Sequence, residues 1–163
     1  MYPDEQMEGA LGDRPARWLV CRTGSRLCAL QLQHVTETMR PLAHELVPGL
    51  PPFVLGLSVI RGSPTPVVDA ARLLGETSAA EGGRWVTIRV GGRAVALAVD
   101  AVVGIRSLGP AAVVGLPPLL RDDATEVVDA LGTLDAELLV LLRSARIVPP
   151  SVWAVLDAGP ERP

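Results

Sequence analysis

The stretch GLSVIRGSPTPVVDAARLL, residues 56–74, decides the predicted fold of this chain. Gly56 opens an apolar run that predicts a strand. Arg61 and Gly62 then interrupt the run, and a glycine at this place supplies the positive φ that tight turns need. The pattern therefore predicts that Arg61 lies at the tip of a turn, beside a residue with no side chain to shield it.

The second part of this stretch predicts a strand that leads into a short helix. Pro64 and Pro66 have φ fixed at about −65°, which keeps the neighbouring backbone extended. Asp69 is a favourable N-cap for a helix over residues 70–74, and Gly75 suits the position after the helix end. We therefore expect strand, turn, strand and helix in succession.

The composition favours a mostly β protein that can bury a core. The chain has 163 residues, of which 48% are apolar and 3% aromatic, and it contains 16 glycines and 15 prolines. Valine in short runs, separated by glycine and proline, favours many short strands over long helices. This length suits one domain or two fused small ones.

The charge distribution argues against a nucleic-acid partner. The net charge is −3, and the acidic segment 1–16, which we expect to be disordered, accounts for all of it. Nucleic-acid affinity rests on clustered cations, and so few aromatic side chains leave few platforms for stacking bases. No signal peptide or membrane-length apolar run is visible, which predicts a cytoplasmic protein without membrane insertion.

Residues 17–32 predict a β-hairpin. Gly24-Ser25 fits a two-residue type II′ turn, and that turn places Cys21 opposite Cys28. One face of the hairpin then carries Leu19, Cys21, Cys28, Leu30 and Leu32. We interpret the cysteines as small buried hydrophobic side chains in a reducing compartment, and a redox pair is the alternative.

The sequence contains an internal duplication. Residues 84–99 predict a second hairpin, turning at Gly91-Gly92, that aligns with the first at an offset of 67. The matches include Arg17/Arg84, Trp18/Trp85, Arg22/Arg89, Gly24/Gly91, Arg26/Arg93 and Leu30/Leu97. Residues 139–148 resemble residues 65–74 at an offset of 74. Each half, with four or five strands, is expected to curl into its own small barrel, and the two barrels are expected to share apolar surface.

The remaining segments complete the predicted order of elements. We expect a short helix or bend at 33–39, an extended link at 40–48, a flexible connector at 75–83 and a strand at 100–107. Two further strands are expected around Asp135-Ala136, followed by a C-terminal helix at 150–157 that Ser151 caps and by a tail at 158–163.

No pattern in the sequence points to catalysis or to a bound cofactor. The motifs Cys-x-x-Cys, HExxH, GxSxG and GxGxxG are absent from the sequence. His34 and His44 stand without nearby ligands, which makes them poor metal ligands. We therefore predict a protein without enzymatic activity, cofactor or metal, whose surface binds other proteins.

A series of short motifs then appears in a fixed order. These are Val35-Thr36-Glu37, Pro48 with Pro51-Pro52, Gly56, Arg61-Gly62, Pro66-Val67-Val68-Asp69 with Arg72-Leu73-Leu74, and, in the second half, Ala98-Val99-Asp100 with Val102 and Gly104. In this order they resemble the CheW-like domain, over nearly the whole chain. The predicted domain spans residues 17–157, with a first repeat at 17–74 and a second at 84–148.

The resemblance implies two SH3-like five-stranded barrels without catalysis or cofactor. It also implies an adaptor that couples the cytoplasmic tip of chemoreceptors to the regulatory domain of a CheA-type histidine kinase, at membrane-associated receptor arrays. The receptor-coupling residues carried over are Val35, Glu37, Gly56, Arg61 and Gly62. From the residues alone, Arg61 either contacts a partner or is a surface arginine paired with Glu37.

One departure from the family pattern motivates an alternative function. The family commonly has Asn-Leu before Arg-Gly, whereas this chain has Val59-Ile60. The alternative is a specialised regulator that binds the kinase, or another signalling protein, without receptor coupling.

Overall fold

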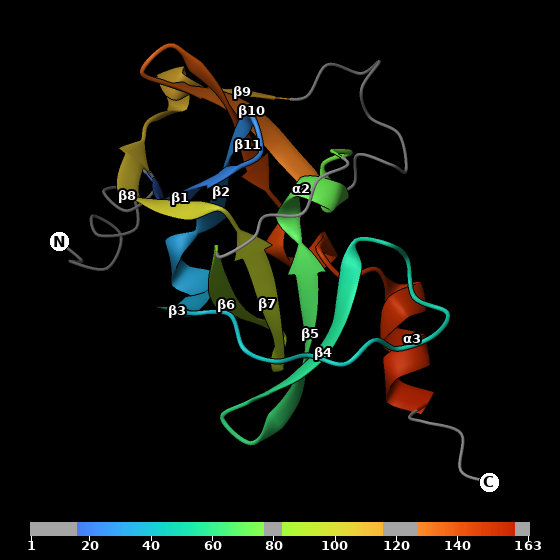
Figure 1. The fold of residues 1–163 in the computed structure, drawn as a ribbon. Helices are drawn as coiled ribbons and strands as arrows, with labels where there is room; N and C mark the ends of the chain where they lie inside the picture. The colour runs from blue at the N-terminus through green and yellow to red at the C-terminus, as the bar shows by residue number, and fades with distance from the viewer. Residues whose placement is uncertain (1–15, 77–82, 116–126, 159–163) are drawn as a thin grey trace, which may run out of the picture.

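The computed structural model describes residues 16–76, 83–115 and 127–158 of the chain. The predictions for residues 1–15, for most of the connector 75–83 and for the tail at 159–163 fall outside these residues. Ala16, expected to be disordered, begins a strand, and Ala158, expected in the tail, ends a helix, so these two boundaries were wrong by one residue. The described residues form two sheets, one above the other in Figure 1.

The larger sheet has six strands, in the spatial order β8 (Ala101–Leu108), β1 (Ala16–Thr23), β2 (Arg26–Gln31), β11 (Glu137–Leu142), β10 (Val128–Leu134) and β9 (Val113–Gly115). The smaller sheet has five, in the order β3 (Val35–Met39), β6 (Arg84–Val90), β7 (Arg93–Val99), β5 (Ser63–Asp69) and β4 (Val54–Ile60). The helical elements are α2 (Ala70–Leu73), α3 (Pro150–Ala158) and the 3-10 turns η1 (Leu32–His34), η2 (Pro110–Ala112) and η5 (Ser144–Arg146).

Local features of the sequence predict the hairpins correctly. β1 pairs with β2 so that Cys21 lies opposite Cys28, and Gly24 in the turn has a φ of 60°. The second hairpin, β6–β7, turns at Gly91 and Gly92 as expected, and both glycines have positive φ. The side chain of Asp69 caps α2, because its carboxylate accepts a hydrogen bond from the backbone N–H of Ala71 at 3.0 Å.

The expectation that each half forms its own barrel is wrong, because the two hairpins are exchanged. The first hairpin, β1–β2, lies in the sheet that otherwise comes from the second half of the chain. The second hairpin, β6–β7, lies among β3, β4 and β5. The exchange follows from the chain path, because η1 carries the chain from β2 in the larger sheet directly to β3 in the smaller one (Figure 1).

The duplication itself is visible in the strand register. β2 pairs in parallel with β11 so that Ala29 lies beside Leu141, and β7 pairs in parallel with β5 so that Ala96 lies beside Val67. Ala96 lies 67 residues after Ala29, and Leu141 lies 74 residues after Val67, so the two pairs join equivalent positions of the two repeats. The strand orders β8-β1-β2-β11-β10 and β3-β6-β7-β5-β4 are therefore two copies of one arrangement.

The two sheets share one apolar core. Its members on the first hairpin are Leu19, Cys21, Cys28 and Leu30, and those on the second are Val86, Ile88, Val95 and Leu97. The corresponding residue numbers differ by 67, so both hairpins use the same face for this contact. Two smaller clusters lie within the individual sheets, around Trp18 and around Trp85. The predicted fold class, mostly β with two SH3-like units on a shared apolar core, is confirmed.

Two local predictions need correction. The segment 33–39 was expected to be a short helix or bend, but only Leu32–His34 is helical and β3 follows at once. This strand forms because its backbone pairs with β6, a partner about 50 residues away in sequence. The C-terminal helix α3 begins at Pro150, so Ser151 lies inside its first turn and is not the cap. Proline suits the first helical position because its missing N–H would be unpaired there in any case.

Candidate functional site

Arg61 lies in the two-residue turn that joins β4 to β5. Arg61 has a φ of 50° and Gly62 a φ of 80°, and Ile60 pairs with Ser63 across the turn. Positive φ at both central residues is the pattern of a type I′ turn, whose twist matches the flanking strands. The side chain of Arg61 is 78% exposed. The turn therefore presents this guanidinium group to solvent, as the sequence predicted.

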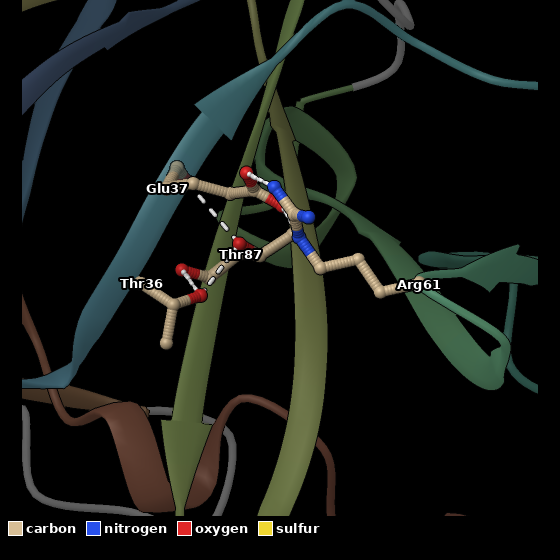
Figure 2. Close-up of polar contacts among 4 residues, drawn as sticks. All are labelled: Thr36, Glu37, Arg61 and Thr87. Atoms are coloured by element: carbon tan, nitrogen blue, oxygen red, sulfur yellow. Dashed lines mark hydrogen bonds and ion pairs between the residues drawn. The ribbon is translucent and has the colours of Figure 1, made fainter.

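The guanidinium of Arg61 is already paired with a carboxylate of the same chain. Its Nε donates to Oε1 of Glu37 at 2.9 Å, and its Nη2 donates to Oε2 at 2.6 Å (Figure 2). Such a two-point contact fixes the orientation of the planar guanidinium as well as its position. Of the two roles that the sequence left open for Arg61, pairing with Glu37 is thus present, and it leaves the outer side of the guanidinium exposed.

This pair joins the two ends of the smaller sheet. Glu37 lies on β3 at one end of the strand order, and Arg61 follows β4 at the other end. In a flat five-stranded sheet the outer strands would stand about 19 Å apart, given a strand spacing of about 4.8 Å. The sheet must therefore curl, as a barrel-like unit requires, although its strands come from both halves of the chain. Backbone bonds support the same closure, since Glu45 and Leu57 exchange N–H···O bonds of 2.8 and 2.9 Å.

Two threonines hold the backbone that carries Glu37. The register of β3 against β6 shifts between Val35 and Glu37, which leaves Thr36 as an additional residue. The hydroxyl of Thr36 donates to the carbonyl oxygen of Thr87 at 3.0 Å and lies 2.7 Å from the Thr87 hydroxyl (Figure 2). The Thr87 hydroxyl in turn donates to the carbonyl oxygen of Glu37 at 3.3 Å. A β-bulge commonly re-aims a side chain. Here the bulge and its hydroxyl bonds fix the strand segment from which Glu37 reaches Arg61.

Sequence reasoning missed Thr36 and Thr87 as parts of the site. A signal was present, because Thr87 is a single hydroxyl in an otherwise apolar stretch, Trp85 to Ile88, and is 5% exposed. A buried hydroxyl needs a hydrogen-bond partner. The sequence did not reveal that this partner comes from β3.

The pairing shifts the ionisation of both side chains. The hydrogen bond from Arg61 lowers the pKa of the Glu37 carboxyl, and the nearby positive charge acts in the same direction. The same hydrogen bond raises the pKa of the Arg61 guanidinium. Both groups are therefore charged at neutral pH, and they form a compact dipole on an exposed surface.

The other predicted site residues lie at different depths. Val35 is half-buried and packs against the shared core. Gly56 is buried within β4 with a φ of 147°, and a Cβ added there would overlap the carbonyl oxygen of Glu45. Gly62 is exposed, and a Cβ added there would meet no neighbouring atom within 4 Å. Only Glu37, Arg61 and Gly62 thus share one exposed surface.

The second repeat has the same turn without the same pair. Asp135 and Ala136 occupy the equivalent turn between β10 and β11, with φ of 49° and 67°. The position equivalent to Glu37 is Gly104, which lies opposite Val20 as Glu37 lies opposite Thr87. The pairing of a strand carboxylate with a turn arginine therefore belongs to the first repeat alone.

The histidines take part in ordinary packing contacts. His34 lies 3.1 Å from the hydroxyl of Ser144, and the ring of His44 lies 6.1 Å from that of Trp85. In the part of the chain that the structure describes, no three His, Cys, Asp or Glu side chains come together as a possible metal site. Within the same residues, no helix is long and apolar enough to cross a membrane.

Comparisons with known proteins agree with this architecture. A family model, the CheW-like domain, matches residues 17–150. Protein FrzA of Myxococcus xanthus is 33% identical over 157 residues, which cover 90% of this chain and 96% of FrzA. The crystal structure of the scaffolding protein TtCheW from Thermoanaerobacter tengcongensis matches with a TM-score of 0.74 at 21% identity, over 85% of this chain and 95% of that one. The chain therefore belongs to the CheW-like domain family, a family of scaffold and adaptor proteins.

Proposed function

We propose that the protein is a non-catalytic adaptor that couples the cytoplasmic tip of chemoreceptors to a CheA-type histidine kinase. The observation that carries this proposal is membership of the CheW-like family across residues 17–150. The adaptor would act in the cytoplasm, at receptor arrays.

The geometry around Arg61 supports a role in receptor contact. A guanidinium has five N–H donors, and only the Nε and Nη2 groups are used by Glu37. The remaining N–H groups face solvent and can donate to a carboxylate or carbonyl oxygen of a partner. Because Glu37 already holds the guanidinium in place, little side-chain freedom is lost on binding.

We assign the proposed receptor-coupling residues two different roles. Glu37, Arg61 and Gly62 form the surface that meets the partner. Val35 and Gly56 act through the fold, because Val35 packs on the shared core and Gly56 lets the backbone of Glu45 approach β4.

For the kinase, the proposal rests on exposed apolar side chains near the closure of the smaller sheet. Leu46 is 83% exposed and Leu42 is 43% exposed, both on the segment that leads from β3 to β4. Contiguous exposed apolar side chains are typical of protein interfaces, and these two lie four residues apart in one segment. We propose this segment as part of the contact with the regulatory domain of the kinase.

The test is a titration of the protein with a chemoreceptor tip fragment and, separately, with the kinase regulatory domain. Arg61→Gln should weaken receptor binding by about tenfold or more, as expected for an interface arginine. Binding of the regulatory domain should not change. Arg84→Gln is the matched control, because Arg84 is an exposed arginine on β6 without a carboxylate partner among the described residues. Equal receptor affinity for Arg61→Gln and the wild type would refute the assigned role of Arg61.

One observation favours a second candidate function. Val59, where relatives commonly carry an amide, is 67% exposed on the outer face of β4. The second candidate is therefore a regulator that binds the kinase without a receptor. Tight binding of the regulatory domain by a protein that binds no receptor tip would favour this candidate over the first.

A further inference from the structure

An open groove lies where β5 and β7 separate. The parallel ladder between these strands covers only Val67–Asp69 and Ala96–Ala98, although both strands begin several residues earlier. Pro64 and Pro66 lie in the part of β5 that pairs with β4 but not with β7. Proline has no N–H to donate to a neighbouring strand. The strands therefore diverge towards their first residues, and a groove of about 300 Å³ remains between them, bordered by α3.

The walls of this groove are partly apolar and partly polar. The apolar part is formed by Leu57, Pro64, Pro66, Ala94, Trp153 and Leu156, and the polar part includes Ser63, Arg89, Arg93 and Asp157. The apolar side chains come from β4, β5, β7 and α3, so elements that are far apart in the sequence converge here. An apolar side chain that entered the groove would leave water for a rigid and preformed site.

The groove carries one positive charge that is not balanced by a neighbouring carboxylate. Arg93 is balanced, because its Nη1 and Nη2 donate to Asp157 at 2.9 and 2.7 Å and its guanidinium lies 4.4 Å from the centre of the Trp153 ring. Arg89 donates only to the carbonyl oxygen of Gly92, at 3.1 Å, and no carboxylate among the described residues pairs with it. An occupant with a negative charge next to an apolar side chain would complement this arrangement.

We propose that this groove binds an extended peptide segment of a partner protein, with an apolar side chain between Trp153 and Pro66 and a carboxylate on Arg89. An extended peptide presents successive side chains on opposite sides, which lets an apolar side chain and the adjacent carboxylate face different walls of the groove. The groove borders the β4–β5 hairpin along its length, while the pair of Arg61 and Glu37 lies at its tip. The inference does not depend on the proposed receptor coupling.

Three tryptophans make the proposal directly testable by NMR. Trp153 lines the groove, whereas Trp18 and Trp85 are 5% and 3% exposed in the two separate cores and serve as internal controls. The probe is the blocked peptide acetyl-Ser-Leu-Glu-Leu-Ser-amide, and the control peptide carries Lys in place of Glu. The indole N–H signal of Trp153 should shift saturably with the acidic peptide, while those of Trp18 and Trp85 should stay in place.

Two variants separate the groove from other sites. Arg89→Gln should weaken binding of the acidic peptide roughly fivefold, the scale of an exposed ion pair, whereas Arg84→Gln on the same strand should leave it unchanged. Arg61→Gln should also leave it unchanged, so the two proposals can fail separately. The inference is overturned by the absence of a saturable shift, by equal affinity for the lysine peptide, by an unchanged affinity in Arg89→Gln, or by an equal loss in Arg61→Gln.

Discussion

Glu37 and Arg61 stand at opposite ends of the strand order of one sheet and are nevertheless joined by two hydrogen bonds of 2.9 and 2.6 Å. The pair can form only when the smaller sheet is curled, and the same two residues are part of the proposed contact surface. A change that opened the sheet would separate Glu37 from Arg61. A partner that took Arg61 away from Glu37 would remove the same link between the two ends of the sheet.

The first prediction concerns the acid sensitivity of this pair. Because Arg61 lowers the pKa of Glu37 below its usual value of 4.5, the folded state binds this proton less tightly than the unfolded state. The contribution of the pair to stability is therefore complete above pH 4.5 and is lost as the pH falls through the lower pKa of the folded state. An NMR titration of the Arg61 Nε–H signal should show it retained at pH 4.5 and lost only in more acidic solution.

The matched variant for this titration is Glu37→Gln. It keeps the shape of the side chain but has no carboxyl group to titrate, so its Arg61 signal should not show the acid transition. If the transition persisted in Glu37→Gln, another acidic group would be the partner of Arg61 in solution.

The fold was predictable where it depends on local chemistry and not where it depends on distant pairing. Gly24, Gly62 and Gly91 mark turns because few other residues adopt positive φ, and their spacing sets the register of each hairpin. The exchange of the hairpins was not predictable in this way. The parallel partner of β2 is β11, more than 100 residues later in the sequence. The apolar faces of both hairpins are alike, so the pattern fits either assignment of the hairpins to the sheets.

The candidate site shows the same division. The exposure of Arg61 follows from its turn, and pairing with Glu37 was one of the two roles that the residues alone left open for it. The bulge at Thr36 depends on a register shift against β6, and no periodicity in the sequence encodes it. The arrangement of Arg93 between Trp153 and Asp157 was likewise missed, because it joins β7 to α3, and Asp157 lies 64 residues after Arg93 in the sequence.

A second prediction compares two glycines that differ in crowding. Gly62→Ala places a side chain at a φ of 80° in open space and should cost about 1 kcal/mol of folding free energy. Gly56→Ala has a φ of 147° and also overlaps the carbonyl of Glu45, so it should cost about 3 kcal/mol or more. Urea denaturation measures both values. Equal losses would mean that the backbone of Glu45 moves away easily and that this contact does not hold the sheet closed.

A third prediction concerns the cysteines. Burial raises the pKa of Cys21 to about 12 and raises that of Cys28 as well, and only the thiolate form is nucleophilic. Iodoacetamide at mildly alkaline pH should therefore leave both thiols unmodified in the native protein and modify both in guanidinium chloride. The structure contains them as free thiols on opposite strands. Rapid modification of the native protein, or conversion to a disulfide by mild oxidants without unfolding, would favour the redox interpretation instead.

The last prediction separates the role of Asp69 as a helix cap from the effect of its buried charge. Its side chain caps α2, and its Oδ2 is buried without a hydrogen-bond partner. Burial raises the pKa of Asp69 above its usual value of 3.8, although the bond from Ala71 and the charge of Arg72, 3.6 Å away, oppose this. The folded state then holds the proton more tightly, so stability falls as the pH rises from 3.8 through the higher pKa of the folded state. Asp69→Asn keeps a capping side chain without a charge and should remove this fall of stability with pH.

Asp69→Ala should cost about 1 kcal/mol of folding free energy at neutral pH, because the cap is lost. Thermal unfolding of the wild type and the two variants across this pH range measures the pH dependence and the loss of stability. If Asn at this position were as costly as Ala at neutral pH, the ion pair with Arg72 would outweigh the cost of burying the carboxylate.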